Sequence, residues 1–503
     1  MVGNTKIQGR SVTGSESTDD RDDIAALAKG GRTNIAGFLL RLAARLPFLF
    51  VAGRWYGPDI LGRFAYAILI IELAAQLSAL GLRRGLAAEL SNSSRQHVHV
   101  LFDALLLATI VSGFAAGFLM LFPQLMFPNS GMNGLDRFLP LIVIAIAWTE
   151  IALAALAYRY DIAATVRSRA IVEPWVISFA AIGFAFYSLR DGLILSYVVS
   201  MLAAMVAALW PMVSSYGLPR GWRPDVVEFW HMARRNSPLA AADAIEWGSR
   251  RLDLAILGLF ASPAIVGIYY VAQQVASLPQ KLKTSFEPIL GPVITRNLHE
   301  GNLSAIGRQV CQVGFWILAA QVGVALALGI PGEAVMGLVG KQFVGGTGAL
   351  EFLLAAEVAA AAAVVSEAAL IYMARLRNLA ISLLTLATQA LLTVGLILLA
   401  RDLGWSSMHQ AAMPALALML SLAFSSFLKT KLLSRLLQVR ISIWRWVLVW
   451  SISAAALLGY GATQLPEWLE LLVGIPVILA AYCYVIWTRG FGEEDRALFK
   501  KSR

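Results

Sequence analysis

Charged residues are scarce in this chain of 503 residues: they make up 14% of it, whereas hydrophobic residues make up 58%. Ordinary soluble domains carry about 25% charged residues, because a folded surface in water needs them. The composition therefore excludes a soluble enzyme and predicts a protein that presents much of its surface to lipid. The net charge of +10 is spread between apolar segments rather than gathered in one patch, which excludes nucleic acid as the expected partner.

Cysteine is nearly absent as well. Cys311 and Cys483 lie in separate apolar segments, so the sequence predicts neither a disulfide framework nor a zinc site. The string GLVGKQF at 337–343 lacks the first glycine and the hydroxyl residue of a phosphate-binding loop, and ATP hydrolysis is therefore not expected. We expect no cofactor, no metal and no catalytic residue. No basic-then-apolar signal peptide opens the chain, and residues 1–32 are predicted to be a disordered cytoplasmic tail.

Apolar segments recur along the rest of the chain. A helix needs about 20 apolar residues to cross the hydrocarbon core of a membrane. Strand-like alternation does not persist anywhere, so the predicted fold class is an all-α polytopic membrane protein with about fourteen transmembrane helices. The predicted spans are 34–54, 63–82, 98–122, 138–158, 170–188, 193–215, 238–260, 264–285, 312–332, 348–373, 378–399, 409–429, 443–462 and 468–488.

The distribution of Lys and Arg sets the orientation, because cytoplasmic loops of membrane proteins are rich in both. With the N-terminus in the cytoplasm, 31 of the 41 basic residues fall on the cytoplasmic side and six on the outer side. One missed span would invert every later loop, so the asymmetry also supports the number of spans. The sequence thus predicts a multi-pass protein with both termini in the cytoplasm.

An internal repeat divides the chain into two halves. GPDILGRFAYA at 57–67 and SPAIVGIYYVA at 262–272 share Pro, Ile, Gly and Ala in one register, and the same register aligns Arg45 with Arg250. Both copies follow a span that begins in the cytoplasm, so the repeat is parallel and predicts two six-helix lobes with the substrate between them. The predicted regions after the tail are an N-lobe at 33–216, a cytoplasmic linker at 217–237, a C-lobe at 238–432, two further helices at 433–488 and a cytoplasmic tail at 489–503.

Ionisable residues inside the predicted spans mark a candidate site. Each costs about 2.5–3.5 kcal/mol at the bilayer centre on insertion scales, so such residues usually face an interior cavity. Arginines suit an anionic substrate, above all a phosphate, and carboxylates can exchange protons or bind a coupling cation. The predicted substrate-binding residues are Arg41, Arg45, Arg250 and Gln76, and the predicted ion-coupling residues are Glu72, Asp243 and Glu246.

Simpler interpretations of these charges stay open. Glu246 and Arg250 lie one helical turn apart and can pair with each other alone. Arg45 and Arg250 can likewise hold the junction between the lobes closed instead of binding a substrate. Further acids inside predicted spans, which can relay protons, bind a cation or simply be solvated, are Glu150, Glu173, Glu351, Glu357 and Glu367.

Several segments carry a family resemblance: the two repeat copies, GLRRGLAAELS at 81–91, GKQFVGGTGALEFL at 340–353 and TRGFGEEDRALFKK at 488–501. With these, the chain resembles the polysaccharide transporter family, the O-antigen and exopolysaccharide flippases of the multidrug, oligosaccharidyl-lipid and polysaccharide exporter superfamily. The resemblance implies two lobes forming a V around a cationic cavity in the bacterial inner membrane, with alternating access by rocking of the lobes. It also implies that Arg41, Arg45 and Arg250 bind a pyrophosphate.

The same resemblance implies a function: a flippase or exporter of a polyprenyl-pyrophosphate-linked oligosaccharide for O-antigen, capsule or exopolysaccharide biosynthesis. The last two helices resemble the pair that holds the polyprenyl tail in lipid II flippases. The implied partners are the lipid-linked oligosaccharide, membrane lipids, H+ or Na+, and glycan polymerase or export machinery. One alternative is a cation-coupled multidrug antiporter, which requires an acidic cavity. A second is a membrane glycan polymerase or ligase, which requires a larger outer domain than the longest outer loop, 123–137.

Overall fold

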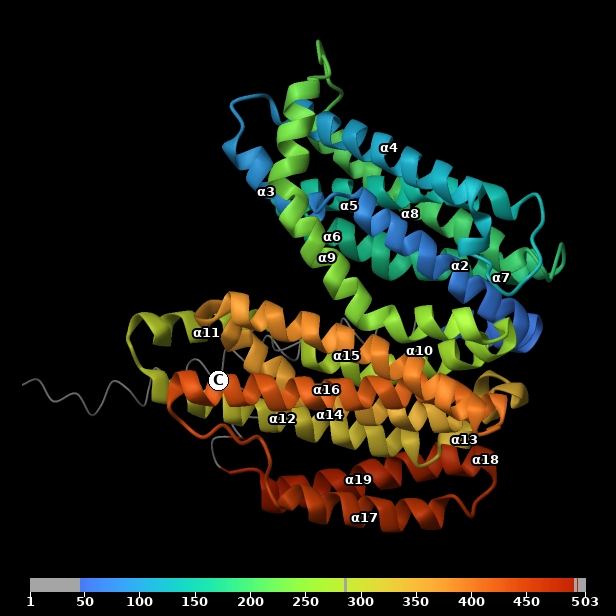
Figure 1. Cartoon of the computed structure of the whole chain (residues 1–503), viewed down its shortest axis with the longest axis vertical. Helices are drawn as coiled ribbons and strands as arrows, with labels where there is room; N and C mark the ends of the chain where they lie inside the picture. Colours follow the sequence, from blue (N-terminus) through green and yellow to red (C-terminus); the bar gives the residue numbers. More distant parts are fainter. Residues whose placement is uncertain (1–45, 285–286, 493–494, 496–503) are drawn as a thin grey trace, which may run out of the picture.

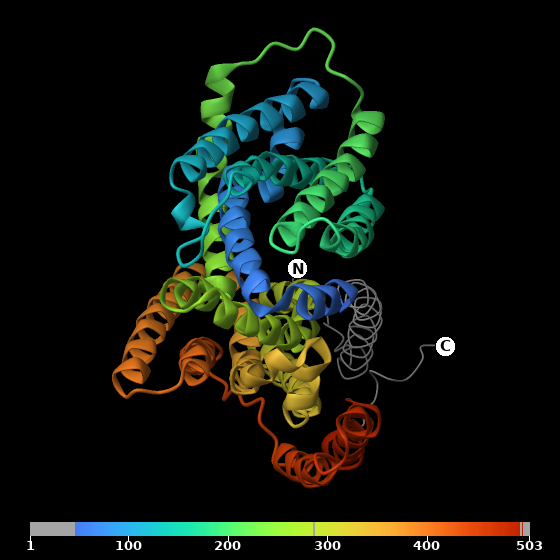
Figure 2. The same ribbon diagram turned by 90° about the vertical axis from the view of Figure 1, so that its right-hand side faces the viewer.

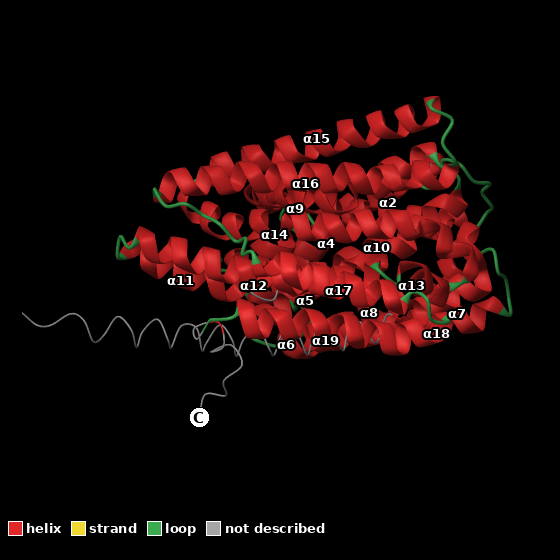
Figure 3. Cartoon of the chain, turned by 90° about the horizontal axis from the view of Figure 1, so that it is seen from below, coloured by secondary structure: helices red, strands yellow, loops and turns green. Residues whose placement is uncertain are grey.

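The computed structural model describes residues 46–284, 287–492 and 495, and within these ranges it contains helices and loops but no strand (Figure 3). Helices are expected in lipid because they satisfy every backbone polar group within one segment. The elements are η1 (Ala52–Tyr56), α2 (Gly57–Ser78), α3 (Leu82–Asn92), α4 (His97–Leu121), η2 (Pro123–Leu125), η3 (Asp136–Leu141), α5 (Ile142–Tyr158), α6 (Ile162–Thr165), η4 (Val166–Val172), α7 (Glu173–Ala185), α8 (Gly192–Tyr216), α9 (Val226–Phe260), α10 (Pro263–Thr284), α11 (Glu287–His299), α12 (Leu303–Gly329), α13 (Gly332–Val339), η5 (Lys341–Gly346), α14 (Thr347–Met373), α15 (Arg375–Asp402), α16 (Ser407–Leu437), α17 (Val447–Ala462), α18 (Glu467–Leu469), η6 (Glu470–Gly474), α19 (Ile475–Val485) and η7 (Ile486–Gly490).

Membrane-spanning character extends over most of the described chain. Ten helical runs among the described residues are long and apolar enough to cross a membrane, and α17 is apolar but shorter. The helices α9 and α10 match the seventh and eighth predicted spans. The first predicted span, 34–54, lies mostly outside the described residues. The predicted fold class, an all-α polytopic membrane protein with about fourteen transmembrane helices, is confirmed.

The helices form two groups that α9 connects. In Figure 1, α2 to α8 make up the upper group, which we call the first group, and α10 to α16 make up the lower or second group. The helix α9 runs from the first group into the second, and α17 and α19 lie at the edge of the second group beside α12. The view from the side separates the two groups in the same way (Figure 2).

Apolar packing explains why α9 connects the groups. Near its beginning, Phe229 and Met232 are buried in a core made with helices of the first group. Near its end, Leu254 is buried in a core that joins both groups and that includes Phe64 of α2 and Tyr269 of α10. Opposite ends of α9 therefore contribute to different cores, and its middle lies at the junction of the groups.

The structure differs most from the predicted spans at α9 and α11. The helix α9 begins at Val226, twelve residues before the predicted span at 238–260, because Asp225 accepts hydrogen bonds from the backbone nitrogens of Val227 and Glu228 and caps the helix. The first turns of α9 are charged, so a criterion based on apolar segments did not include them in the predicted span. The helix α11 was likewise not predicted, since its sequence lies between two predicted spans.

The helical path is interrupted by a turn between α2 and α3, at Gly81. This residue has a φ of 71°, in the left-handed region where glycine is favoured. A Cβ atom on Gly81 would also lie 2.5 Å from the backbone nitrogen of Ala240 and 2.8 Å from the carbonyl oxygen of Asn236. A tight turn is thus combined here with a close approach to α9, and it brings the start of α3 against that helix.

Candidate functional site

The two repeat segments pack directly against each other where α2 and α10 begin. A Cβ atom on Gly62 would overlap with the carbonyl oxygen of Pro263 and lie 2.5 Å from the nitrogen of Gly267. A Cβ atom on Gly267 would overlap with the carbonyl oxygen of Pro58 and lie 2.9 Å from the nitrogen of Gly62. Glycine is needed at both positions because the two backbones cross there. We call this end of the bundle the α2/α10 end.

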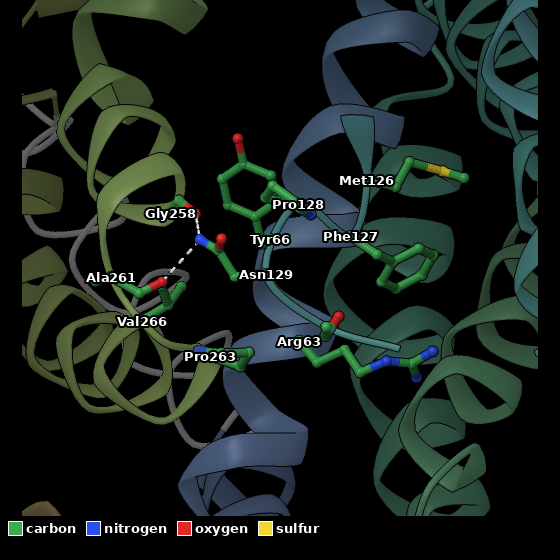
Figure 4. Close-up of a pocket in the computed structure, with 12 residues that line it drawn as sticks. Arg63, Tyr66, Met126, Phe127, Pro128, Asn129, Gly258, Ala261, Pro263 and Val266 are labelled. Carbon is green, nitrogen blue, oxygen red and sulfur yellow. Dashed lines mark hydrogen bonds between the residues drawn. The ribbon is translucent and has the colours of Figure 1, made fainter. Parts of the chain in front are cut away.

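The loop between α4 and α5 reaches across the same end (Figure 4). Asn129 Nδ2 donates to the carbonyl oxygens of Gly258 at 2.8 Å and Ala261 at 3.0 Å, where α9 finishes and helix carbonyls lack partners within the helix. The loop is held to α2 by a buried ion pair between Arg63 and Asp136. A loop that is anchored on the first group therefore forms hydrogen bonds with the end of α9.

We expect Asn129→Ala to loosen the α2/α10 end. The substitution removes two hydrogen bonds, each worth about 0.5–1.5 kcal/mol net, while the glycine crossing remains. Spin labels at Met132 and Leu259 should then report a broader distance distribution that includes longer separations. Asn302→Ala, which removes the side-chain cap of α12, is the matched control. An unchanged distribution in Asn129→Ala would show that the loop does not hold this end closed.

Two other side chains join the groups at the α2/α10 end. Arg54 donates from Nη2 and Nε to the carbonyl oxygen of Leu338, at 2.9 and 3.2 Å. Gln342 Nε2 donates to the carbonyl oxygen of Gly53 at 3.1 Å. Gln342 belongs to the segment at 340–353 that carries part of the family resemblance, so this segment contributes to closure of the α2/α10 end.

A cluster of charged side chains lies between α3 and α9. Asp243 accepts from Arg83 at 3.2 Å and pairs with Arg84 Nε at 2.8 Å. One turn further along α9, Glu246 pairs with Arg84 and, at 3.0 Å, with Arg250. Three of the predicted site residues are thus brought together. The arginines of α3 were missed because the sequence analysis treated them only as basic residues of a cytoplasmic loop.

A second ion pair joins α2 to α9. Glu72 Oε2 lies 3.3 Å from Arg251 Nη2, and both side chains are about one-third exposed. Gln76, one turn after Glu72, is half-buried. The adjacent arginines Arg250 and Arg251 of α9 therefore have different carboxylate partners. Arg251 was not among the predicted site residues, although its position next to Arg250 inside a predicted span was a usable signal.

The remaining predicted residues have separate outcomes. Arg41 and Arg45 lie outside the described residues, so their role, and the equivalence of Arg45 to Arg250 that the repeat indicates, stay predictions. The contact between Glu246 and Arg250 matches the simpler interpretation, in which the two pair along one helix. Because Glu246 also pairs with Arg84 of α3, the contact is part of a larger network rather than an isolated pair.

Another charged cluster lies within the first group. Arg169 pairs with Glu173 at 2.8 Å and with Glu150 of α5. The π-helical segment η4 carries Arg169, and π-helical turns often occur at functional sites. Both acids were predicted candidates for proton relay. Arg169 was not predicted, because it lies just before the predicted span at 170–188.

Two buried charged residues make contacts that were not predicted, one in the second group and one near the end of α9. Lys429 is buried in α16, where its Nζ lies 3.0 Å from Glu367 Oε2 and 3.2 Å from Ser382 Oγ. Asp253 of α9 is buried and accepts from the hydroxyl of Tyr269 at 2.6 Å. Within the described residues, no group of three or more His, Cys, Asp or Glu side chains is placed to hold a metal ion.

Comparison with protein families shows which family the chain belongs to. The family described as "Polysaccharide biosynthesis protein" matches residues 51–310, which is more than half of the sequence. The chain belongs to this family. The match covers the crossing of Gly62 and Gly267, the charged cluster of α3 and α9, and both copies of the repeat. The search of curated proteins found no match to the chain.

Several solved structures share the fold of this chain. "Lipid II flippase MurJ, inward closed conformation" matches 90% of this chain and 98% of its own, with a TM-score of 0.65 and 12% identity. An inward-facing MATE family transporter of the MOP superfamily matches 82% and 95%, with a TM-score of 0.54 and 14% identity. The Vibrio cholerae MATE transporter VcmN in its bent form matches 83% and 98%, with a TM-score of 0.52 and 13% identity.

Proposed function

We propose that this protein is a flippase that moves a polyprenyl-pyrophosphate-linked oligosaccharide from the cytoplasmic to the outer leaflet, for O-antigen, capsule or exopolysaccharide biosynthesis. Membership of a polysaccharide biosynthesis family supports the pathway class, and the fold shared with a lipid II flippase supports transport of a lipid-linked molecule. The observation that carries the proposal is the set of arginines where α3 meets α9. Guanidinium groups bind phosphate through paired hydrogen bonds.

In this proposal the two helix groups are the two lobes. The N-lobe is 33–216 and the C-lobe is 238–432. The linker 217–237 includes the first turns of α9, and the helices of 433–488 lie beside the C-lobe. The excess of Lys and Arg on one side supports cytoplasmic termini in the bacterial inner membrane. The α2/α10 end then faces the outside and is closed in this state, so export requires α2 and α10 to separate.

The pyrophosphate is held by Arg250 together with Arg41, Arg45 and the arginines of α3, and Gln76 contacts the substrate nearby. Glu72, Asp243 and Glu246 couple transport to H+ or Na+. Each of these acids is paired with arginine in the structure, so protonation or cation binding at an acid would leave an arginine free for phosphate. The proposed partners are the lipid-linked oligosaccharide, membrane lipids and glycan polymerase or export machinery.

The main alternative is a cation-coupled multidrug antiporter, which the similarity to MATE transporters supports. Purified protein in liposomes separates the two functions. A flippase makes lipid-linked oligosaccharide on the inner leaflet accessible to an external glycosidase, whereas an antiporter expels a cationic dye when an H+ or Na+ gradient is applied. Dye transport without glycosidase access would overturn the proposal. Lengthening of the glycan would indicate a polymerase instead.

We also predict the orientation of four exposed positions. In a variant that lacks Cys311 and Cys483, single cysteines at Gly134 and Leu403 should react with a membrane-impermeant maleimide in intact cells. Single cysteines at Ser94 and Gln438 should react only after permeabilisation. All four positions are exposed in the structure. Their labelling therefore reports the side of the membrane on which each position lies, and not whether its side chain is buried. Reaction at position 438 in intact cells would contradict the proposed orientation.

A further inference from the structure

Glu246 occupies the position that an anionic ligand of the arginines would take. Its Oε1 pairs with Nη2 of Arg250 at 3.0 Å, and its Oε2 pairs with Nη2 of Arg84. One carboxylate therefore bridges two guanidinium groups that come from two different helices, α9 and α3. A phosphate group bridges arginines in the same manner, with separate oxygens directed at separate guanidinium groups.

The neighbouring acid Asp243 has a different environment. Its side chain is 1% exposed and pairs with both Arg83 and Arg84, whereas the side chain of Glu246 is 43% exposed. Removing Asp243 from its partners would leave a buried charge unpaired, which is costly. Glu246 can leave its partners without that penalty, because solvent reaches it. While it is ionised, Asp243 thus holds the arginines of α3 in place, and Glu246 is the acid that a phosphate can replace.

We infer that Glu246 is an internal substitute for the phosphate of the substrate, and that a pyrophosphate group displaces it from Arg84 and Arg250 on binding. This inference rests on the proposed function, since it concerns the same arginines. While Asp243 keeps Arg84 in position, displacement of Glu246 exposes two prearranged guanidinium groups. In the absence of substrate, Glu246 neutralises them and keeps other anions out.

Competition of this kind lowers the apparent affinity of the resting protein. When a site is free for only a fraction of the time, the apparent Kd rises by the inverse of that fraction. Loss of the Glu246 charge should therefore tighten binding of a pyrophosphate lipid, although the residue lies in the site. An acid with only a structural role predicts the opposite, unchanged or weaker binding.

The first test measures binding of polyprenyl pyrophosphate to the full-length protein in detergent by titration calorimetry. We expect Glu246→Gln to lower Kd by about tenfold, as for a site that is free about one-tenth of the time in the wild type. Glu228→Gln is the matched control, because Glu228 lies on α9 and pairs at 2.6 Å with Arg235, outside the cluster. Its Kd should stay at the wild-type value. Arg250→Ala should bind more weakly than wild type.

The outcomes separate this inference from the proposed function. Tighter binding in Glu246→Gln alone supports the inference. Equal tightening in Glu228→Gln would overturn it, because a general loss of negative charge would then explain the change. Unchanged or weaker binding in Glu246→Gln, with Arg250→Ala impaired, would overturn it while the flippase proposal stands. Absence of binding by the wild-type protein would count against the proposed function itself.

A second test uses the wild-type protein and so does not depend on folding of a variant. A carbodiimide modifies accessible carboxyl groups, and mass spectrometry of peptides locates the modification. We expect saturating polyprenyl pyrophosphate to increase modification of Glu246 several-fold, because the displaced carboxylate loses both guanidinium partners. Asp243 should stay unmodified, since it remains buried and paired. Equal or lower modification of Glu246 in the presence of the ligand would overturn the inference.

Discussion

Arg250→Ala is expected to reduce export at limiting substrate by about tenfold to a hundredfold and to leave lipid-linked oligosaccharide in the cytoplasmic leaflet. A charge-assisted hydrogen bond to phosphate is worth about 1.5–3 kcal/mol, and each 1.4 kcal/mol corresponds to about tenfold in binding. Arg45→Ala should have a similar effect, because the repeat aligns Arg45 with Arg250 in the sequence. The measurement is the fraction of oligosaccharide that an external glycosidase reaches, at equal protein abundance.

Two further variants distinguish a phosphate ligand from a structural arginine. Arg250→Lys should recover only part of the activity, because an ammonium group keeps the charge but loses the two-pronged geometry. Arg235→Ala is the matched control on α9, since Arg235 pairs with Glu89 and Glu228 outside the cluster. Normal export by well-expressed Arg250→Ala would exclude the residue as a phosphate ligand. Poor insertion of Arg250→Ala would indicate a structural role instead.

Most of the membrane architecture could be predicted from hydropathy. The span predicted at 98–122 is α4 at His97–Leu121, and the span predicted at 348–373 is α14 at Thr347–Met373. Such segments form helices because, in lipid, a single segment can satisfy all of its backbone polar groups only as a helix. The beginning of α9 could not be predicted in this way. Its first turns are charged and are stabilised by the Asp225 cap and by packing of Phe229 and Met232, which hydropathy does not register.

The candidate site was only partly predictable, because the sequence places residues along a helix but does not identify their partners. Spacing along one helix predicted the contact of Glu246 with Arg250. The partners from α3, Arg83 and Arg84, depend on the turn at Gly81 that directs α3 against α9. A search for charges inside apolar windows could not reach residues that lie beyond the end of a window and enter the site through a turn.

The repeat made a different kind of prediction. Aligned glycines were interpreted as a sign of two related halves, and this interpretation did not include contact between the two copies. In the structure Gly62 and Gly267 are the residues at which the copies touch. A sequence repeat can therefore mark the contact between two halves as well as their existence, when its shared residues are those that allow two backbones to approach closely.

Gly62→Ala is accordingly expected to open the α2/α10 end and to lower thermal stability. The new methyl group would overlap with the carbonyl oxygen of Pro263, which belongs to a backbone and cannot rotate away. Overpacking of this kind costs about 1–3 kcal/mol. Gly267→Ala should behave alike, because its methyl group would meet Pro58 in the equivalent place. The measurements are the melting temperature in detergent and the reaction of a cysteine at Val266 with an impermeant maleimide. Val266 is 2% exposed at this end of the bundle, so its labelling reports opening.

Gly113→Ala is the matched control for the crossing, because nothing lies within 4 Å of a Cβ atom at that position of α4. This variant should melt at or above the wild-type temperature, since alanine favours helix over glycine by about 1 kcal/mol. The effects of Gly62→Ala and Gly267→Ala should not add, because either methyl group alone separates the same two backbones. Additive losses of stability would mean that the two glycines belong to independent contacts. Wild-type stability and labelling in both variants would exclude the glycine crossing as the closure of this end.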